Sequence, residues 1–538
     1  MNRSRWILAL SFFGVIFGGT LAFWLVEDGW SFLDALYMTV ISVTTVGYGE
    51  VHELSSAGRV VAMVVLCAGL GVFGLVIQQV TSYAVGGALG NAVERRRMAG
   101  KVAAMSGHTV ICGLGSRGQA LAAGMEPGHY VAIERDADGD AINRLKGQGG
   151  VVFAGDAQDE ALLELAGVKK AAQVVVAAGA DETNLEVARV ARDCLGRDSK
   201  TRVVVAIEEY ASRDWFEDKL HRQGIEPIGL REQSLLVLAR KLALELVDGR
   251  SDPPDQPLRI AVQASESMLS EVLRVLVMVM QTGGSQKPEI SVFGCGKEFV
   301  SLFEARFPEH GLCCRISWEE GEFGSLGVSS EGPAFALFAM KSNLRSLELA
   351  ERCLSRHPEM KSAQVVACLT GAGPLKDLAE RNQRGEDAGE DVSPCVVSID
   401  DFLSRREGIV SYAMDEEGRH LHDQYRANAG FPVDEWSALS EFHRNSNRLA
   451  ALQRDVYQQV WDKWRRQTDE STLLEYLAEC EHMRWMAFHV MNGYRHDNRG
   501  VSREQRLRMK VHPDLVAYDT LGEEDKEKDR DKIRAALR

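Results

Sequence analysis

Residues 45–49 of the chain, Thr-Val-Gly-Tyr-Gly, are of types whose backbone carbonyl oxygens could bind a cation. Glycine adopts backbone conformations that other residues avoid, so Gly47 and Gly49 allow a run whose carbonyl oxygens point inward. Around a symmetry axis, such carbonyls replace the hydration shell of a cation. The Thr45 hydroxyl would supply further oxygen ligands. The alternative is a chance pentapeptide in an ordinary loop.

The segments around this loop suit a membrane. Two apolar runs, from Trp6 to Val26 and from about Val60 to Tyr83, are long enough to span a bilayer, which takes about 20 helical residues. The first exceeds the roughly 7–15 apolar residues of a signal peptide and lacks a following cleavage site, which favours a retained helix. Between the runs, residues 31–43 are long enough for a half-helix whose negative C-terminal end would face the cavity.

Over residues 1–100 the chain resembles the two-helix potassium channels. The run Thr45, Val46, Gly47, Tyr48 and Gly49 matches the selectivity filter of that family letter for letter. The resemblance implies a homotetramer in a lipid bilayer, with K⁺ as the permeant ion.

Basic residues set the expected orientation in the membrane. Arg3 and Arg5 precede the first span, and residues 95–97, all arginine, follow the second. The positive-inside rule therefore places both ends of the chain in the cytoplasm. The expected location is a bacterial inner membrane. Residues 69–74 of the second span contain three glycines, which fit a gating hinge or close helix packing equally well.

A second set of residues suits phosphate chemistry. Gly113, Gly115 and Gly118 form a GxGxxG pattern between a strand and a helix, and Glu134 ends the next strand about 20 residues later. The glycines let the helix N-terminus approach a pyrophosphate, and the acid accepts hydrogen bonds from ribose hydroxyls. An acid here disfavours a 2′-phosphate, so NAD(H), ADP or ATP fits better than NADP. Arg117, inside the loop, is available to a phosphate.

Strands and helices alternate over residues 107–247, which resemble the RCK, or TrkA-like, domains that regulate K⁺ conductance. The resemblance places Asp156, after the third strand, against the adenine. The alternative is a Rossmann scaffold that keeps its glycines for packing and binds no ligand. No second catalytic domain follows, so an enzyme is not expected. Strands are expected at 108–112, 130–134, 151–157, 173–177 and 202–207, and helices at 181–196 and 212–221.

The pattern restarts after a polar, proline-rich linker at 248–257, which predicts a degenerate second Rossmann-like domain over 257–402. Asn184 and Asn343 mark equivalent helices, which supports an internal duplication. The glycines of 294–296 follow the second strand, whereas the true fingerprint position, 264–268, has none. We therefore expect no dinucleotide bound in the usual way. Strands are expected at 259–263, 289–293, 313–318, 334–340, 363–369 and 394–399, a helix at 267–281 and a loop at 374–393.

Residues 415–538 are predicted to be helical and rich in aromatic and arginine residues. Over about 430–531 they resemble the repeat domain of ryanodine receptors. That resemblance rests on these motifs in order: Trp436…Asn447-Arg448, Glu481-His482-Met-Arg484-Trp485, Gly493-Tyr494, His512-Pro513 and Glu527-Lys-Asp-Arg530.

Two interpretations of this C-terminal region stay open. In the first, it senses a separate signalling nucleotide in a pocket; in the second, it is a scaffold or docks a partner, and Glu481 and Arg484 form a buried pair. The last helix, 523–538, is expected to be solvated. For the pocket, arginines would meet phosphate while aromatic rings stack on a base: Arg444, Arg448 and Arg484, with Trp436, Trp485 and Tyr494.

The composition limits the remaining choices. A net charge of -15 argues against nucleic-acid binding, and ten cysteines without a CxxC pair favour a reduced cytosolic part with no metal site. Ca²⁺ has no specific support. The expected fold class is membrane α, with two transmembrane helices and a pore loop, followed by tandem α/β Rossmann-like RCK domains and a small all-α domain. The expected function is a nucleotide-gated potassium channel; the alternative is a constitutive or partner-regulated one.

Overall fold

The computed structural model forms two compact units, Met1–Gly100 and Lys101–Arg538. The loop predicted at 374–393 lies outside the residues that the structure describes. The described residues are 3–85, 88–136, 140–196, 199–250, 256–323, 333–358, 360, 364–371, 394–404, 413–428 and 433–537.

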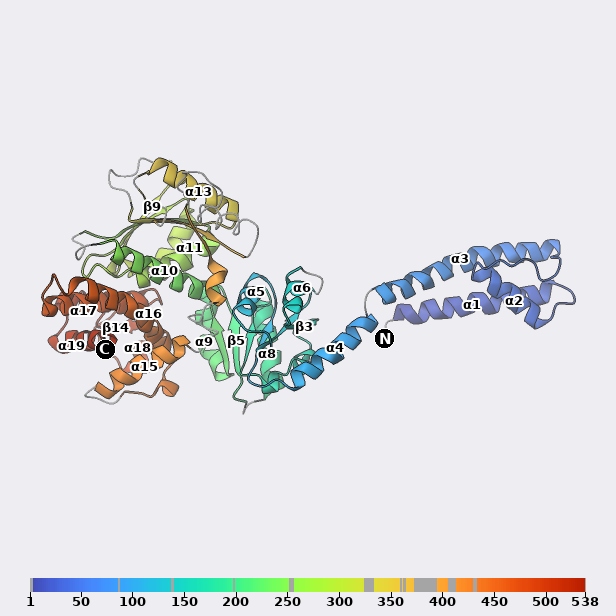
Figure 1. Cartoon of the computed structure of the whole chain (residues 1–538), viewed down its shortest axis with the longest axis horizontal. Coiled ribbons are helices and arrows are strands. Elements are labelled where there is room, and N and C mark those ends of the chain that lie inside the picture. The colour runs from blue at the N-terminus through green and yellow to red at the C-terminus, as the bar shows by residue number, and fades with distance from the viewer. Residues whose placement is uncertain are drawn as a thin grey trace. The chain divides into compact units, whose positions relative to one another are not determined.

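The first unit consists of helices. The two long apolar runs form α1 (Arg3–Val26) and α3 (Ser56–Val85), and the predicted half-helix is α2 (Phe32–Val43). A capping box starts α2, because the Ser31 hydroxyl accepts from the Asp34 amide while the Asp34 carboxylate accepts from the Ser31 amide. All three helices pack on one another, as Figure 1 shows.

One helical stretch among the described residues, Ser56–Leu75, is both long and apolar enough to cross a membrane, with a mean hydropathy of 2.1. Ser11–Val26 and Phe32–Val43 are shorter apolar helices. The first side chains of α1 lie outside the described ones, so the first predicted span is tested only in part.

The second unit starts within α4 (Ala88–Ala103) and contains a parallel sheet of six strands in the order β3-β2-β1-β4-β5-β6. Its strands are short and nearly fully buried, as expected when helices cover both faces. All five predicted strands are present, whereas β6 and the helices α6, α7 and α10 were not predicted. The strands are β1 (Thr109–Cys112), β2 (Tyr130–Glu134), β3 (Val151–Ala154), β4 (Gln173–Val176), β5 (Arg202–Ala206) and β6 (Ile225–Ile228). The helices are α5 (Ser116–Ala123), α6 (Asp140–Gly147), α7 (Glu160–Leu165), α8 (Asp181–Leu195), α9 (Tyr210–Arg222) and α10 (Leu230–Asp248).

A second parallel sheet repeats this topology, in the order β12-β11-β10-β7-β8-β9. The predicted internal duplication is therefore visible in the strand order. In Figure 1, α13 lies on one face of this sheet and α11 with α10 on the other. The strands are β7 (Arg259–Ala264), β8 (Glu289–Phe293), β9 (Arg315–Glu319), β10 (Phe335–Ala339), β11 (Val365–Leu369) and β12 (Cys395–Ser398). The helices are α11 (Glu266–Val279), α12 (Lys297–Arg306), α13 (Asn343–Arg356) and the short η4 (Ile399–Ser404).

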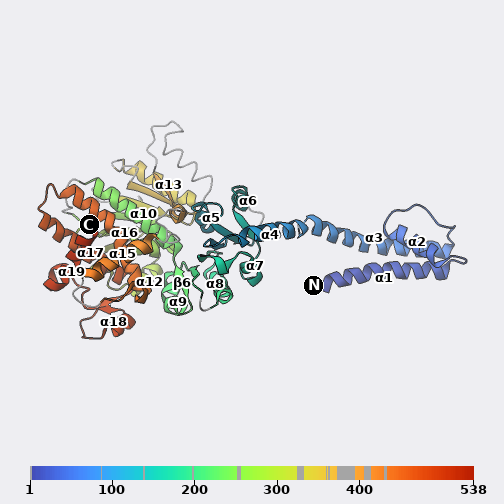
Figure 2. The ribbon, with the colours of Figure 1, turned by 60° about the horizontal axis from the view of Figure 1, so that its bottom comes forward.

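The C-terminal helices share a core with the second sheet. Leu449 and Val456 of α16 and Met483 of α17 belong to the same buried apolar cluster as Leu273 of α11. Figure 2 shows these helices gathered beside α10. The helices are α15 (Ala413–Asn428), α16 (Glu441–Trp464), α17 (Glu470–Val490), α18 (Arg503–Met509) and α19 (Glu523–Ala536), with short strands β13 (Arg495–His496) and β14 (Val511–His512).

The last helix differs from its prediction in one respect. It is helical, but Asp529 and Ile533 are buried against α17 rather than solvated. The sequence did not reveal this buried face, because most residues of α19 are charged and the few apolar ones lie near its C-terminal end.

Candidate functional site

The loop after α2 has the backbone that its glycines allow. Thr45, Gly47 and Gly49 all have positive φ, of 58°, 62° and 120°, while the residues between them do not. A positive φ at Thr45 is unusual for a residue with a branched side chain. The amides of Val46 and Gly47 donate to the carbonyl of Ile41, which fixes the loop on the C-terminal end of α2. This alternation suits a loop that presents successive carbonyl oxygens to one side.

The glycines of α3 have different surroundings. A Cβ on Gly69 would lie 2.9 Å from the Val43 side chain, so this position is needed for the close approach of α3 to α2. Gly71 and Gly74 have open space around them within the described part of the chain. Close packing therefore accounts for Gly69 alone.

In the glycine loop after β1, Gly113 and Gly118 lie too close to neighbouring backbone to carry a side chain. Gly113 has φ of +97°, and a Cβ there would collide with the backbone of Ala177 and Ala178 after β4. A Cβ on Gly118 would collide with the Gly113 carbonyl. Gly115 caps α5 and stays exposed, which leaves the first amides of α5 open to a ligand.

The predicted partners of the glycines lie at the same edge of the sheet. Glu134 accepts hydrogen bonds from the Leu114 amide at 2.5 Å and the Asp136 amide at 3.0 Å, so its carboxylate reaches from β2 to the glycine loop. Asp156 is exposed after β3 and accepts from the Gln158 amide. The Nη1 atom of Arg117 lies 2.9 Å from an oxygen of Glu208.

The second copy reverses this arrangement. Glu266, the first residue of α11, accepts from the Gly296 amide at 2.9 Å, so a carboxylate lies at the helix N-terminus where a phosphate would bind. The loop after β7 indeed occupies the fingerprint position, and the glycines of 294–296 follow β8, as predicted.

The helices that the two asparagines mark are equivalent, as predicted, although the asparagines themselves are not. Asn184 and Asn343 lie in equivalent helices but at different positions. Asn184 accepts from the amide of Ala178, six residues earlier, and in α13 the Ser346 hydroxyl has that role toward Met340. The helices match, but the asparagines are three residues out of register.

A cavity of about 810 Å³ lies among α15, α16, α17 and α19 and is called here the four-helix cavity. Arg484 and Trp485 of the predicted pocket line it, together with Glu481. The other polar or aromatic residues in its wall include Tyr425, His443, Asn447, Lys528 and Lys532.

The remaining four residues of the predicted pocket do not line this cavity. Trp436 is buried against His422, Tyr494 stacks on Phe442, and Arg448 pairs with Glu441. Arg444 donates to the Trp436 carbonyl and lies 3.6 Å from Glu441. These four side chains make packing and polar contacts to other residues of the region, and of the six residues in the predicted pocket Arg484 and Trp485 line the cavity.

The floor of the four-helix cavity is a buried ion pair. Arg484 donates from Nε and Nη2 to the two oxygens of Glu481, at 2.7 and 2.8 Å, and both residues are only 1% exposed. Burial alone would raise the pKa of Glu481, but Arg484 outweighs it and lowers the pKa to about 2. The Nη1 atom of Arg484 is buried without a hydrogen-bond partner.

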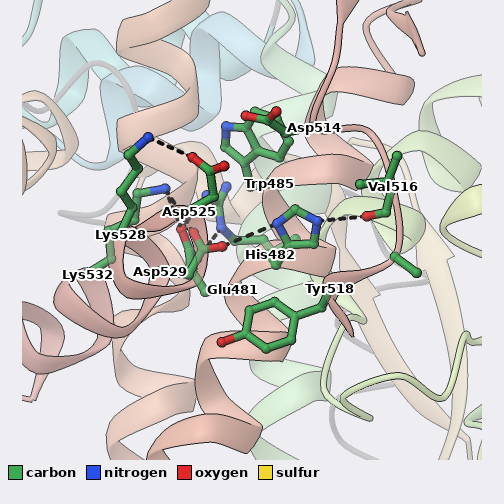
Figure 3. A network of polar contacts seen from close by, with 12 residues as sticks. Glu481, His482, Trp485, Asp514, Val516, Tyr518, Asp525, Lys528, Asp529 and Lys532 are labelled. Carbon is green, nitrogen blue, oxygen red and sulfur yellow. Dashed lines mark hydrogen bonds and ion pairs between the residues drawn. The ribbon is translucent and has the colours of Figure 1, made fainter. Parts of the chain in front are cut away.

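Next to this floor, His482 joins three elements (Figure 3). Its Nδ1 lies 3.2 Å from Asp529 of α19 and its Nε2 lies 2.9 Å from the Val516 carbonyl. Lys532 of α19 reaches both Glu481 and Asp529, at 3.5 Å each. These contacts therefore connect α17, which lines the cavity, to α19 and to the segment that contains Val516. Among the residues described, no group of three or more His, Cys, Asp or Glu could hold a metal ion.

Sequence reasoning missed Glu208. The pair Glu208-Glu209 has the composition of a helix start, yet Glu208 is only 9% exposed and its carboxylate contacts the glycine loop. Its place directly after β5 was the available signal, because ligands of such sheets bind at the carboxyl ends of the strands.

Comparison with known proteins identifies two segments. Residues 10–85 match the ion channel family and residues 109–228 match the TrkA-N domain. The ion channel match supports the prediction that the chain is an ion channel protein and not an enzyme.

Individual relatives match about a third of the chain or less. Potassium channel protein 1 of Methanocaldococcus jannaschii is 24% identical over 29% of this chain and 48% of its own length. Probable potassium channel protein 2 of the same organism is 27% identical, over 31% and 49%. The calcium-gated potassium channel TvoK of Thermoplasma volcanium is 30% identical, over 27% and 40%. The chain thus spans about half the length of the curated relatives it matches. A solved structure of the GsuK channel superposes with a TM-score of 0.36 and 15% identity, over 74% of this chain and 95% of that one.

Proposed function

We propose that four copies of this chain form a potassium-selective channel that an adenine nucleotide gates. The alternation of positive and negative φ over residues 45–49, between two apolar helices, carries the proposal. Four such loops around an axis would replace the hydration shell of K⁺ with carbonyl oxygens. The match of residues 10–85 to the ion channel family and the similarity to proteins named as potassium channels support the same function.

The domains have distinct roles in this proposal. Residues 1–100 form the pore in an inner membrane with both ends cytoplasmic, and residues 107–247 bind NAD(H), ADP or ATP through Gly113, Gly115, Gly118, Glu134 and Asp156. Residues 257–402 pair with this domain without binding a dinucleotide in the usual way. A nucleotide shifts the open probability only by binding one conformation of the ring more tightly than another.

Recordings of the purified full-length protein in planar bilayers test both parts. Under a K⁺/Na⁺ gradient we expect a K⁺-selective current that at least one of NAD⁺, NADH, ADP and ATP changes from the cytoplasmic side. Glu134→Ala should keep the current and lose the response. A non-selective current would overturn the pore assignment, and a response that survives Glu134→Ala would overturn the site.

A second function is proposed for the C-terminal region, residues 415–538, which resemble the ryanodine-receptor repeat. The four-helix cavity favours a ligand, because its volume lies within the range of small-molecule sites and a buried Arg484 nitrogen lacks a partner there. The shared core with α11 favours a scaffold, because removing α16 and α17 would expose apolar residues of the second domain. Deletion of residues 415–538 would therefore disturb both functions at once.

Point variants separate the two roles. Trp485→Ala changes the cavity wall, whereas Trp461→Ala changes a half-buried indole of α16 that does not line the cavity. If the region senses a ligand, a cell-extract component should raise the unfolding temperature of the wild-type channel and of Trp461→Ala but not of Trp485→Ala. Equal shifts in all three would leave the scaffold as the better account.

A further inference from the structure

The glycine loop already holds a charged partner. Arg117, the second residue of α5, places Nη1 at 2.9 Å from Glu208, and its side chain is 29% exposed. The loops after β1 and β5 lie at the same edge of the sheet because all the strands are parallel. A phosphate at the start of α5 would therefore meet an arginine that a carboxylate already neutralises.

Glu208 is held firmly at this position. Its backbone amide and that of Glu209 donate to the Asp181 carboxylate, both at 3.1 Å. Its second oxygen accepts from the Arg231 amide at 3.3 Å, at the start of α10. The carboxylate thus joins the glycine loop to the helix that leads into the second domain.

From Arg231 the ionic contacts continue into that domain. The Nε atom of Arg231 lies 2.7 Å from Glu271 of α11. On the same helix, Arg274 pairs with Glu232 at 2.9 Å and donates to the Met491 carbonyl at the end of α17, also at 2.9 Å. A chain of ionisable side chains therefore connects the glycine loop, the second domain and the C-terminal helices.

A second contact joins the same loop to the second domain. A Cβ on Gly371, after β11, would lie 3.6 Å from the Ser116 side chain, and Leu403 of η4 packs in the apolar core of the first domain. The Gly371 amide donates to Asp400 at 2.8 Å, which fixes this approach. The glycine loop is thus a contact point between the domains as well as a ligand site.

We propose that Glu208 competes with the phosphate of the bound nucleotide for Arg117, and thereby sets nucleotide affinity and reports occupancy to the second domain. This inference rests on the proposed nucleotide site. When a phosphate takes Arg117, the Glu208 carboxylate is left with Arg231, whose Nε lies 3.7 Å from Glu208 and 2.7 Å from Glu271. A stronger pull of Glu208 on Arg231 weakens the contact between Arg231 and Glu271, and this favours a rearrangement of α10 against α11. Glu232 and Arg213 also face this cluster, and they keep their own pairing.

The test measures ADP binding to the full-length protein by calorimetry. Glu208→Gln keeps the shape of the side chain and removes the competing charge, so we expect ADP to bind about three- to tenfold more tightly. Arg117→Gln should weaken binding by about tenfold. In the Arg117→Gln background, Glu208→Gln should have no effect, because the competition needs both residues. Glu226→Gln is the matched control, since Glu226 pairs with Arg202 at 2.5 Å on β5 and β6 of the same sheet.

Gating supplies the second readout. Glu208→Gln should bind ADP more tightly yet show a smaller change in open probability, a combination that a merely structural residue would not produce. Glu208→Asp, which keeps the charge but shortens the reach, should lie between the wild type and Glu208→Gln. Equal ADP affinity in the wild type and Glu208→Gln would overturn the competition alone. Absence of ADP and NAD⁺ binding by the wild-type chain would overturn the nucleotide site and the competition together.

Discussion

The two six-stranded sheets have the same strand order and differ at the loop after the central strand. Both helices that follow have an extended N-cap residue, Gly115 in α5 and Ser265 in α11, which aligns the two copies residue by residue. In this register Gly118 corresponds to Met268, and Ser116 corresponds to Glu266. The first copy leaves its helix N-terminus open, and the second fills it with its own carboxylate.

This difference separates what makes the fold from what makes the site. The fold depends on buried apolar strands, which both copies keep. The site depends on a few positions without side chains and on one acid. In the first copy, Glu134 reaches from the second strand to the glycine loop; in the second copy, Glu266 reaches in the opposite direction. A duplicated scaffold can therefore lose its ligand while its topology stays intact.

The largest effect on nucleotide affinity is expected when Gly118 is replaced by methionine, the residue at the corresponding position of the second copy. Gly118→Met would push a Cβ into the Gly113 carbonyl and cost about 1–3 kcal/mol of stability. A bound phosphate would lose two or more charged hydrogen bonds, so nucleotide affinity should fall about 100-fold or more. Calorimetry and thermal unfolding of the full-length protein measure both.

Met268→Gly is the reciprocal control for this exchange. It opens a cavity at a residue that is 3% exposed, so it should destabilise the protein by about 2–5 kcal/mol while nucleotide affinity stays unchanged. Wild-type affinity in Gly118→Met would show that the ligand does not use the start of α5.

The sequence was sufficient for the strands and for the glycine fingerprint. Runs such as 173–177 are continuous and apolar, and the spacing between glycines and acid is local. It was insufficient for β6, because Ile225–Ile228 contains Glu226 and Pro227 and breaks the apolar pattern of a central strand. That strand lies at the edge of the sheet, where such residues are tolerated.

Contacts between residues far apart in the sequence could not be predicted either. Arg117 and Glu208 are separated by most of a domain in the sequence, and their pairing follows only from the strand order. Likewise, Arg448 and Arg484 have the same type and lie in neighbouring helices. One pairs with Glu441 away from the four-helix cavity, and the other forms the floor of that cavity. Residue type alone does not show which face of a helix is free.

A smaller effect on nucleotide affinity is expected from replacing the carboxylate that contacts the neighbouring loop in each copy, Glu134 in the first and Glu266 in the second. Glu134→Ala should weaken nucleotide binding by about tenfold to 100-fold, because the ribose would lose hydrogen bonds to a charged group. Glu266→Ala removes the matching contact in the second copy, so the affinity should not change. Titration of each full-length variant with ADP measures the difference. Equal losses in both would mean that the second copy also binds the nucleotide.

The smallest effect is expected on the pH dependence of stability, from a third position at which the two copies differ. Glu271 of α11 corresponds in register to Leu121 of α5, and it is only 5% exposed. Burial raises the pKa of Glu271 from 4.5 to about 8, against the opposing influence of Arg231 and with the help of Glu208 and Glu232. The folded protein therefore holds this proton more tightly than the unfolded chain does. Its contribution to stability is complete below about pH 4.5 and is lost as the pH rises through about 8.

Glu271→Leu gives the second copy the residue of the first and should remove this pH dependence. The unfolding temperature of the full-length protein, followed between about pH 5 and pH 8, should fall with rising pH in the wild type and fall less steeply in Glu271→Leu. Glu245→Leu, at an exposed carboxylate of α10 that lies 3.7 Å from Lys241, should keep the wild-type slope. A slope that Glu271→Leu leaves unchanged would show that Arg231 keeps Glu271 ionised at neutral pH, and that the two copies do not differ in the charge state of this helix.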